Sequence, residues 1–234
     1  MRNTTFHRLG VGLVISAALF TFTSAVEAGP PLVCHPFEIG DAKSLPWGNS
    51  QSWDSPKVGY EIAKLAQDTI ALLSPEVPVI VRMETLRRAV IYSEKDQRIA
   101  YELLSRLMAR ALEAGSSGKA NALAWFDAGY LVETYKQAKW MYDKQSSWLS
   151  KQNFIQGLNG YAWVAKALRV GGDTASMEFA AALMKEGAWP NEHFQRALAG
   201  ATDGSLLARN LVAQFGDQGK SIAELRAKFE KGKK

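Results

Sequence analysis

The chain has few of the residues on which catalytic sites and disulfide frameworks depend. It contains one cysteine and three histidines among 234 residues, so no disulfide can form within the chain. It also has no Gly-rich phosphate loop, no His-Glu-x-x-His, no Gly-x-Ser-x-Gly and no Cys-x-x-Cys. These absences argue against a conventional hydrolase and leave a packed hydrophobic core as the source of stability.

Charge of one sign is not in large excess either. The 28 Lys and Arg residues stand against 23 Asp and Glu, for a net charge of +5 at pH 7. Apart from a short lysine-rich end, the positive charges are spread along the chain, and such a surplus does not indicate a nucleic-acid-binding protein. Hydrophobic residues make up 47% of the chain and charged residues 22%, which is typical of a globular domain.

The first 28 residues have the organisation of a secretory signal peptide. Arg2 and Arg8 supply positive charge, Leu9–Phe22 is apolar, and Val26-Glu27-Ala28 forms a cleavage site of small residues. We therefore expect a periplasmic or secreted protein. We expect neither a nucleic-acid partner nor a transmembrane anchor once residues 1–28 are removed.

Prolines are concentrated in the segment that follows. Five of the eight lie between Pro30 and Pro56, where neither helical nor strand periodicity is present. Because proline fixes φ and lacks an N–H donor, we expect residues 29–54 to form an extended segment. Its large apolar side chains are expected to anchor it onto the rest of the protein: Phe37, Ile39, Leu45, Trp47 and Trp53.

From Ser55 onward the sequence has the capping residues and apolar spacing of successive helices. We expect helices over about 55–73, 79–92, 96–115, 119–140, 150–171 and 173–187. Two shorter helices begin at Pro190 and at Thr202-Asp203, and a capping box at Ser221-Glu224 begins the last one. No stretch alternates with period two, so the fold class is all-α, with residues 55–234 as a single helical domain.

Two of these helices lack a polar face. The segments 122–135 and 154–168 are apolar on nearly all sides, so we expect both at the centre of the domain with amphipathic helices around them. Gly129 and Gly160 cost about 1 kcal/mol each relative to Ala in a helix, and we expect them where helices approach closely.

Helices of this length joined by short turns predict an array of antiparallel helical hairpins, either an α-solenoid or an irregular bundle. Trp125-x-x-Ala128-Gly129 resembles the opening of a tetratricopeptide repeat. The small and aromatic positions of its second half fall on Met141 and Gln145, and no strict internal period is present. The resemblance therefore concerns the shape of the array.

Cys34-His35-Pro36 is the most unusual local motif. Thiolate and imidazole are common ligands of zinc and soft metals, and the thiolate is also a redox nucleophile. Haem attachment requires Cys-x-x-Cys-His, and Pro31 stands at the first cysteine position. The alternative is a small buried thiol beside a histidine, which is the more common environment of a free cysteine.

Asp127 lies inside the apolar segment 122–135. A carboxylate beside Trp125, Phe126 and Tyr130 is costly to bury unless it is paired or protonated, so we expect a raised pKa. We expect an ion pair with an arginine that precedes it in the chain: Arg87, Arg88, Arg106 or Arg110. A structural ion pair is favoured over a general acid.

Aromatic residues are concentrated just after Asp127. Tyr130, Tyr135, Trp140, Tyr142 and Trp148 lie within one short stretch, and such side chains often line sugar or peptide grooves. Aromatic residues at helical spacing more often belong to a core.

Export, helical architecture and missing catalytic motifs favour a non-enzymatic protein, without a cofactor, that binds a protein, a peptide or a component of the cell envelope. The candidate binding residues are Trp47, Trp53, Tyr130, Trp140, Tyr142 and Trp148. The alternative is a periplasmic redox, metal- or haem-associated protein that acts through Cys34 and His35. A third hypothesis is an enzyme with Asp127 as its acid.

Overall fold

The regular secondary structure of this protein is helical. The computed structural model describes residues 31–50, 52–116, 122–142, 148, 154–171, 173–185, 191–216 and 219–231. Within these ranges no strand is present, and the one strand-like feature is an isolated antiparallel bridge between Trp47 and Pro56. The fold is therefore all-α, as the sequence predicts.

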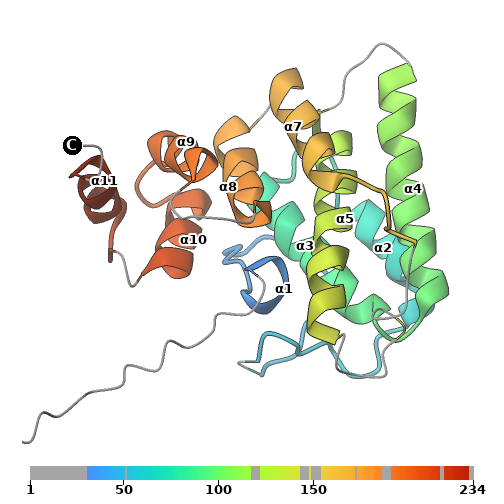
Figure 1. The fold of residues 1–234 in the computed structure, drawn as a ribbon. Helices are drawn as coiled ribbons and strands as arrows, with labels where there is room; N and C mark the ends of the chain where they lie inside the picture. The colour runs from blue at the N-terminus through green and yellow to red at the C-terminus, as the bar shows by residue number, and fades with distance from the viewer. Residues whose placement is uncertain are drawn as a thin grey trace, which may run out of the picture.

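The helices form a larger group and a lateral extension. The elements are α1 (Pro31–Cys34), the 3-10 turn η1 (Ile62–Lys64), α2 (Leu65–Ala71), α3 (Val79–Ser93), α4 (Gln97–Ser116), α5 (Ala122–Tyr142), α7 (Gly160–Val170), α8 (Thr174–Met184), α9 (Glu192–Gly200), α10 (Leu206–Phe215) and α11 (Ile222–Lys231). Figure 1 shows α2–α5 and α7 together, with α8–α11 continuing to one side toward the C-terminus.

The centre of the larger group is formed by α3 and α5. Every residue of α3 except Arg88 is buried, and Phe126, Tyr130, Leu131 and Tyr135 of α5 are fully buried. The sequence predicts the central position of 122–135. It also predicts that the charged helix after Pro78 is peripheral, and this is wrong, because other parts of the chain cover its charged side chains.

The second predicted central helix is shorter than expected. Residues 154–159 form turns, and α7 begins only at Gly160. The reason is local: Asn159 caps the helix by accepting the Ala162 N–H at 2.8 Å, and Gly157 has a φ of +81°. Ala162 and Arg169 of α7 are exposed, so this helix has a solvent face and is not apolar all round.

The start of the helical domain also differs from the prediction. Residues 55–61 are not helical, and helical structure begins at Ile62. The Gly48 N–H donates to the Ser55 carbonyl at 2.7 Å beside the Trp47–Pro56 bridge, and Gly59 has a φ of +78°. These interactions extend the irregular N-terminal segment, predicted to end at residue 54, as far as residue 61. The predicted extended region also contains the short helix α1.

Helices α5 and α7 cross at two glycines. A Cβ atom added to Gly129 would lie 2.5 Å from the Gly160 carbonyl oxygen, and one added to Gly160 would meet the Gly129 carbonyl. No larger residue fits at either position without moving a backbone. The glycines predicted to allow close approach therefore do so against each other.

Side-chain caps define the remaining helix starts. Asp173 and Ser221 cap α8 and α11 as predicted, each accepting a main-chain N–H three residues on, at 3.1 and 3.2 Å. The caps of α9 and α10 are Asn191 and Ser205, so these helices begin slightly later than predicted.

Candidate functional site

The central helix α3 carries buried charges. Arg82, Glu84 and Arg87 are each at most 1% exposed, and Arg88 is half-buried. Glu84 pairs with two arginines: its Oε2 accepts from Arg87 Nε at 2.7 Å, and its Oε1 accepts from Arg88 Nε at 2.6 Å. Buried charges are retained at low cost only where their remaining donors and acceptors are also satisfied.

The N-terminal segment supplies those remaining partners through its main chain. Arg87 Nη1 donates to the carbonyls of Val33 and Trp53 at 3.0 and 2.8 Å. Arg88 Nη1 donates to the Leu45 carbonyl at 2.6 Å, and the Phe37 N–H donates to Glu84 Oε2 at 3.0 Å. The charges on α3 therefore bind an irregular polypeptide by its backbone.

Two further helices hold the same segment in the same way. The Leu32 N–H donates to Gln137 Oε1 of α5 at 2.8 Å. Asn210 of α10 bonds both main-chain groups of Glu38: its Oδ1 accepts the N–H and its Nδ2 donates to the carbonyl, each at 2.8 Å. We refer to Glu84, Arg87, Arg88, Gln137 and Asn210 as the main-chain clamp. Of its members only Arg87 and Arg88 were named from the sequence, and there as possible partners of Asp127.

The two candidate tryptophans of the N-terminal segment lie against the core. The Trp47 ring meets the Tyr92 ring edge-on at 5.8 Å, and the guanidinium carbons of Arg87 and Arg88 lie 5.1 and 5.3 Å from its centroid. Trp53 is half-buried against the core, and its carbonyl accepts from Arg87. Both rings are partly used in packing, which limits the surface they offer to a partner.

Asp127 forms a buried ion pair. Its Oδ2 accepts from Arg82 Nη1 at 2.6 Å, and both side chains are 1% exposed. Burial raises the pKa of Asp127 to about 6, and the positive charges of Arg82 and Arg110 partly offset this rise. The partner is thus none of the four arginines expected from the sequence, and Arg82 also donates to the carbonyls of Leu73, Ser74 and Val77. This arrangement connects α3 and α5 to the turn between α2 and α3.

Cys34 is half-buried at the end of α1. Its thiol donates to Met141 Sδ at 3.1 Å, and burial raises the pKa of the thiol despite the opposing charge of Arg87. His35 is also half-buried. In the described ranges, no three His, Cys, Asp or Glu side chains are placed to hold a metal ion.

The aromatic candidates of α5 and beyond do not converge on one groove. Tyr130 and Tyr135 are fully buried, whereas Trp140 is 64% exposed. Trp148 is half-buried, and its indole N–H donates to the Ser93 carbonyl at 3.2 Å. The side chain of Tyr142 lies outside the described residues. Trp140 is the candidate whose position in the structure suits contact with a partner.

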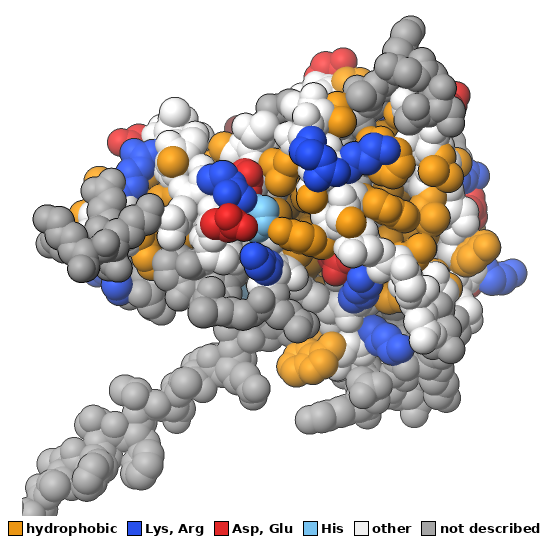
Figure 2. Space-filling view, turned by 45° about the horizontal axis from the view of Figure 1, so that its top comes forward, with side chains coloured by type: hydrophobic (Ala, Val, Ile, Leu, Met, Phe, Trp, Pro, Cys, Tyr) orange, Lys and Arg blue, Asp and Glu red, His pale blue; other side chains and the backbone are white. Residues whose placement is uncertain are grey.

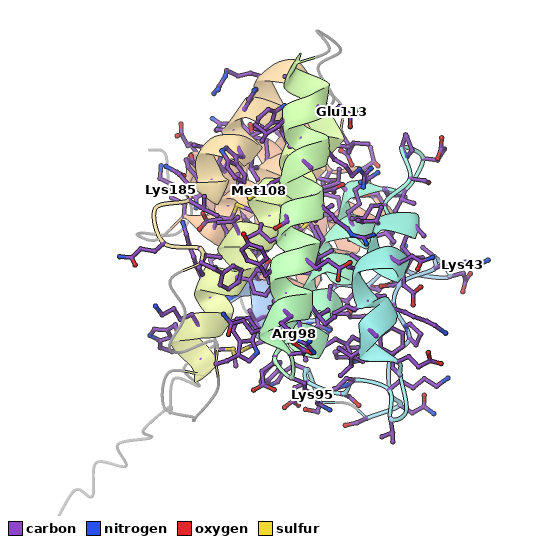
Figure 3. All side chains as sticks on the ribbon, turned by 90° about the vertical axis from the view of Figure 1, so that its right-hand side faces the viewer. Lys43, Lys95, Arg98, Met108, Glu113 and Lys185 are labelled. Carbon is purple, nitrogen blue, oxygen red and sulfur yellow. The ribbon has the colours of Figure 1, made fainter. Side chains whose placement is uncertain are left out.

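Helix α4 exposes large apolar side chains. Its core face buries Ala100, Leu103, Leu104, Leu107 and Ala111. Beside that face, Tyr101 and Leu112 are 61% and 58% exposed, and Met108 lies between them along the helix. Figure 3 shows Met108 and Glu113 on different sides of α4, with Arg98 near the beginning of the helix. The apolar arc of α4 is therefore wider than the surface that the core covers.

A hydrogen-bonded chain of polar side chains joins α7, α8 and α9. The Tyr161 hydroxyl lies 2.5 Å from His193 Nε2, and Glu178 Oε2 lies 2.5 Å from His193 Nδ1. Arg196 Nε donates to Glu178 Oε1 at 2.7 Å. The sequence offered little indication of this cluster, because its members come from three helices and follow no local motif.

The chain matches no protein-family model, no curated protein and no solved structure. Across the described ranges, no helix is both long enough and apolar enough to cross a membrane.

A shallow depression of about 300 Å³ lies between the N-terminal segment and α2. Its lining carries charges of both signs, from Lys57, Glu61, Lys64 and Asp68. The Tyr60 hydroxyl donates to Asp68 Oδ2 at 2.7 Å, and this hydrogen bond forms one side of the depression. This mixed lining selects no single class of ligand.

Proposed function

We propose that this protein is exported and acts without catalysis, as a helical-repeat-like protein that binds a protein, a peptide or a component of the cell envelope. The observation that carries the proposal is the apolar stripe of α4 formed by the exposed Tyr101 and Leu112, with the partly buried Met108 between them. A surface helix needs one apolar face to pack against a core, and Tyr101 and Leu112 lie outside that face. Exposed apolar side chains gathered on one face are typical of interaction surfaces.

Two further helices also carry exposed apolar side chains. Trp140 near the end of α5 is 64% exposed, and Val170 at the end of α7 is 38% exposed. Lys166 Nζ lies 3.4 Å from the centroid of the Trp125 ring, so a cation accompanies the aromatic side chains. Figure 2 shows hydrophobic side chains gathered on the side of the molecule that carries α4, α5 and α7, with Lys and Arg side chains among them.

The arrangement of the helices supports the repeat-like part of the proposal. Helices adjacent in sequence pack against each other along α4, α5, α7, α8 and α9. This succession is expected of a hairpin array, in which each helix contacts its neighbours in the chain. The main-chain clamp supports a binding role as well, because it is a set of side chains that already holds an irregular polypeptide segment.

Site-specific photo-crosslinking in the native host tests the binding surface. A crosslinking amino acid at position 112 of the full chain is expected to give discrete adducts with an envelope protein or peptide. The matched control is position 109, an exposed alanine on the polar side of α4. The proposal fails if position 112 gives no more adducts than position 109.

Export is tested separately, by the N-terminal sequence of the protein purified from cell-envelope and medium fractions. The residues of the signal peptide lie outside the described ranges. Cleavage after Ala28 predicts a mature chain that begins at Gly29. A full-length chain recovered from the cytoplasm would contradict this part of the proposal.

A further inference from the structure

We propose that Tyr161 is a nucleophilic modification site, whose phenol accepts an acyl group from an activated ester with His193 as the base. This inference is independent of the proposed function, because it concerns a different cluster of residues from the α4 stripe. Three features carry it: the Tyr161–His193 contact, the Glu178–His193 contact and the burial of the histidine between them.

The first feature is the contact between nucleophile and base. A hydroxyl within hydrogen-bond reach of an imidazole, itself oriented by a third group, is the arrangement that activates nucleophilic side chains. The oxygen of Tyr161 lies 2.5 Å from His193 Nε2, and the two rings meet edge-on with centroids 5.6 Å apart. Tyr161 is half-buried, so part of it faces solvent.

The second feature defines the tautomer of the histidine. A carboxylate oxygen 2.5 Å from a ring nitrogen requires a proton between them, so we assign that proton to Nδ1, which donates to Glu178. Nε2 then has a free lone pair and accepts the Tyr161 O–H. Arg196 Nε donates to the other carboxylate oxygen of Glu178, Oε1, at 2.7 Å. With Nδ1 protonated, the 2.8 Å contact between Arg196 Nη2 and His193 Nδ1 brings two donors together and is not a hydrogen bond.

The third feature is burial. His193 is 5% exposed, so its orientation is restricted by α7, α8 and α9 packed around it. Tyr161 itself packs in part against the hydrophobic core, so apolar side chains border its ring. An apolar border beside a reactive hydroxyl suits the aryl or alkyl part of an ester.

The Tyr161 oxygen attacks the carbonyl carbon of the ester while its proton moves to His193 Nε2. The bond between the Tyr161 oxygen and the carbonyl carbon forms, and the bond from that carbon to the leaving oxygen breaks. His193 then gives the proton to the leaving alcohol or phenol. Glu178 stabilises the imidazolium during the transfer, which makes it a positioning residue.

The experiment is acylation of the full mature chain with 4-nitrophenyl acetate, followed by peptide mass spectrometry. Tyr101 serves as an internal control, because it is 61% exposed whereas Tyr161 is only half-buried. Base assistance is typically worth at least about a hundred-fold, so Tyr161 is expected to acquire acetyl about a hundred times faster than Tyr101. Acetylation of Tyr161 at the same rate as Tyr101, or more slowly, overturns the proposal. This result requires no variant protein.

Variants separate a reactive cluster from a structural one. His193→Gln keeps a hydrogen-bonding group but removes the base, so Tyr161 acetylation is expected to fall to the rate of Tyr101. Glu178→Gln is expected to lower the rate less, because it removes the stabilising charge and leaves the imidazole. A folded His193→Gln protein that acetylates Tyr161 at the wild-type rate overturns the proposal. Crosslinking at position 112 does not depend on acetylation of Tyr161, so either proposal can fail while the other stands.

Discussion

Asn210 holds Glu38 by both of its main-chain groups, across 172 residues of sequence, with two bonds of 2.8 Å. The residue next to Asn210 holds the same Glu38 differently: Arg209 Nε pairs with its side-chain carboxylate at 2.6 Å, and the two side chains are 40% and 52% exposed. Asn210 and Arg209 therefore allow a direct comparison between a buried main-chain contact and an exposed ion pair, both made with Glu38.

Asn210→Ala is expected to lower the free energy of unfolding by about 2 kcal/mol, because the amide is buried and its loss leaves main-chain groups of Glu38 without their partner. Arg209→Ala is the control and should change stability by no more than about 0.5 kcal/mol, as is usual for an exposed ion pair. Urea denaturation of the two variants measures both values. Equal effects of the two substitutions would contradict the importance of the clamp.

The buried Asp127 predicts a specific dependence of stability on pH. Its pKa rises from 3.8 to about 6 on folding, so the folded state binds the proton more tightly. The contribution of Asp127 is therefore most favourable below about pH 4 and is lost as the pH rises to about 6, by about 2 to 3 kcal/mol. The check is the difference in unfolding free energy between wild type and Asp127→Asn across this range. A constant difference would contradict the raised pKa.

Gly129→Ala is expected to destabilise the protein by about 1 to 3 kcal/mol, because the new methyl group meets the Gly160 carbonyl at the α5–α7 crossing. Helix propensity alone predicts the opposite, a gain of about 1 kcal/mol. Ala162→Gly, at an exposed position of α7, measures the effect of helix propensity on stability alone, because no clash is involved there. Thermal unfolding distinguishes a destabilising clash from a gain in helix propensity. Increased stability of Gly129→Ala would show that α5 and α7 can move apart at this crossing.

Cys34 is expected to react slowly with iodoacetamide at neutral pH in the folded protein and faster after denaturation. Burial raises the pKa of this thiol and so reduces its reactive thiolate form. Mass spectrometry of the alkylated chain, with and without urea, provides the measurement. Fast labelling of the folded protein, or a metal or haem bound at Cys34 and His35, would support the redox alternative over the binding protein.

Local sequence patterns predicted much of the fold. The helices α3, α4 and α5 agree closely with their predicted ranges, because capping residues and apolar spacing act within a few residues. The predictions that failed involve longer-range effects. The helix expected from Ser55 is replaced at its start by main-chain bonds with Gly48, and the charges of α3 are buried only because the N-terminal segment covers them.

One sequence feature could have indicated the central position of α3. Its apolar residues leave no continuous polar face, so Arg82, Glu84 and Arg87 had to lie among buried side chains. The partners themselves could not be predicted. Asn210 and Glu38 are far apart in sequence, and Tyr161, Glu178 and His193 come from three helices that only the packed domain brings together.

The order in which the chain is made gives the Asn210–Glu38 contact a further meaning. Residue 38 is synthesised early and residue 210 late, so Asn210 can engage Glu38 only after almost the entire chain has emerged. Contacts of such large sequence separation form slowly, because the loop between them must first close. Until then the part of the N-terminal segment around Glu38 lacks its buried main-chain partner, so the last helices to be made complete the packing of one of the first segments.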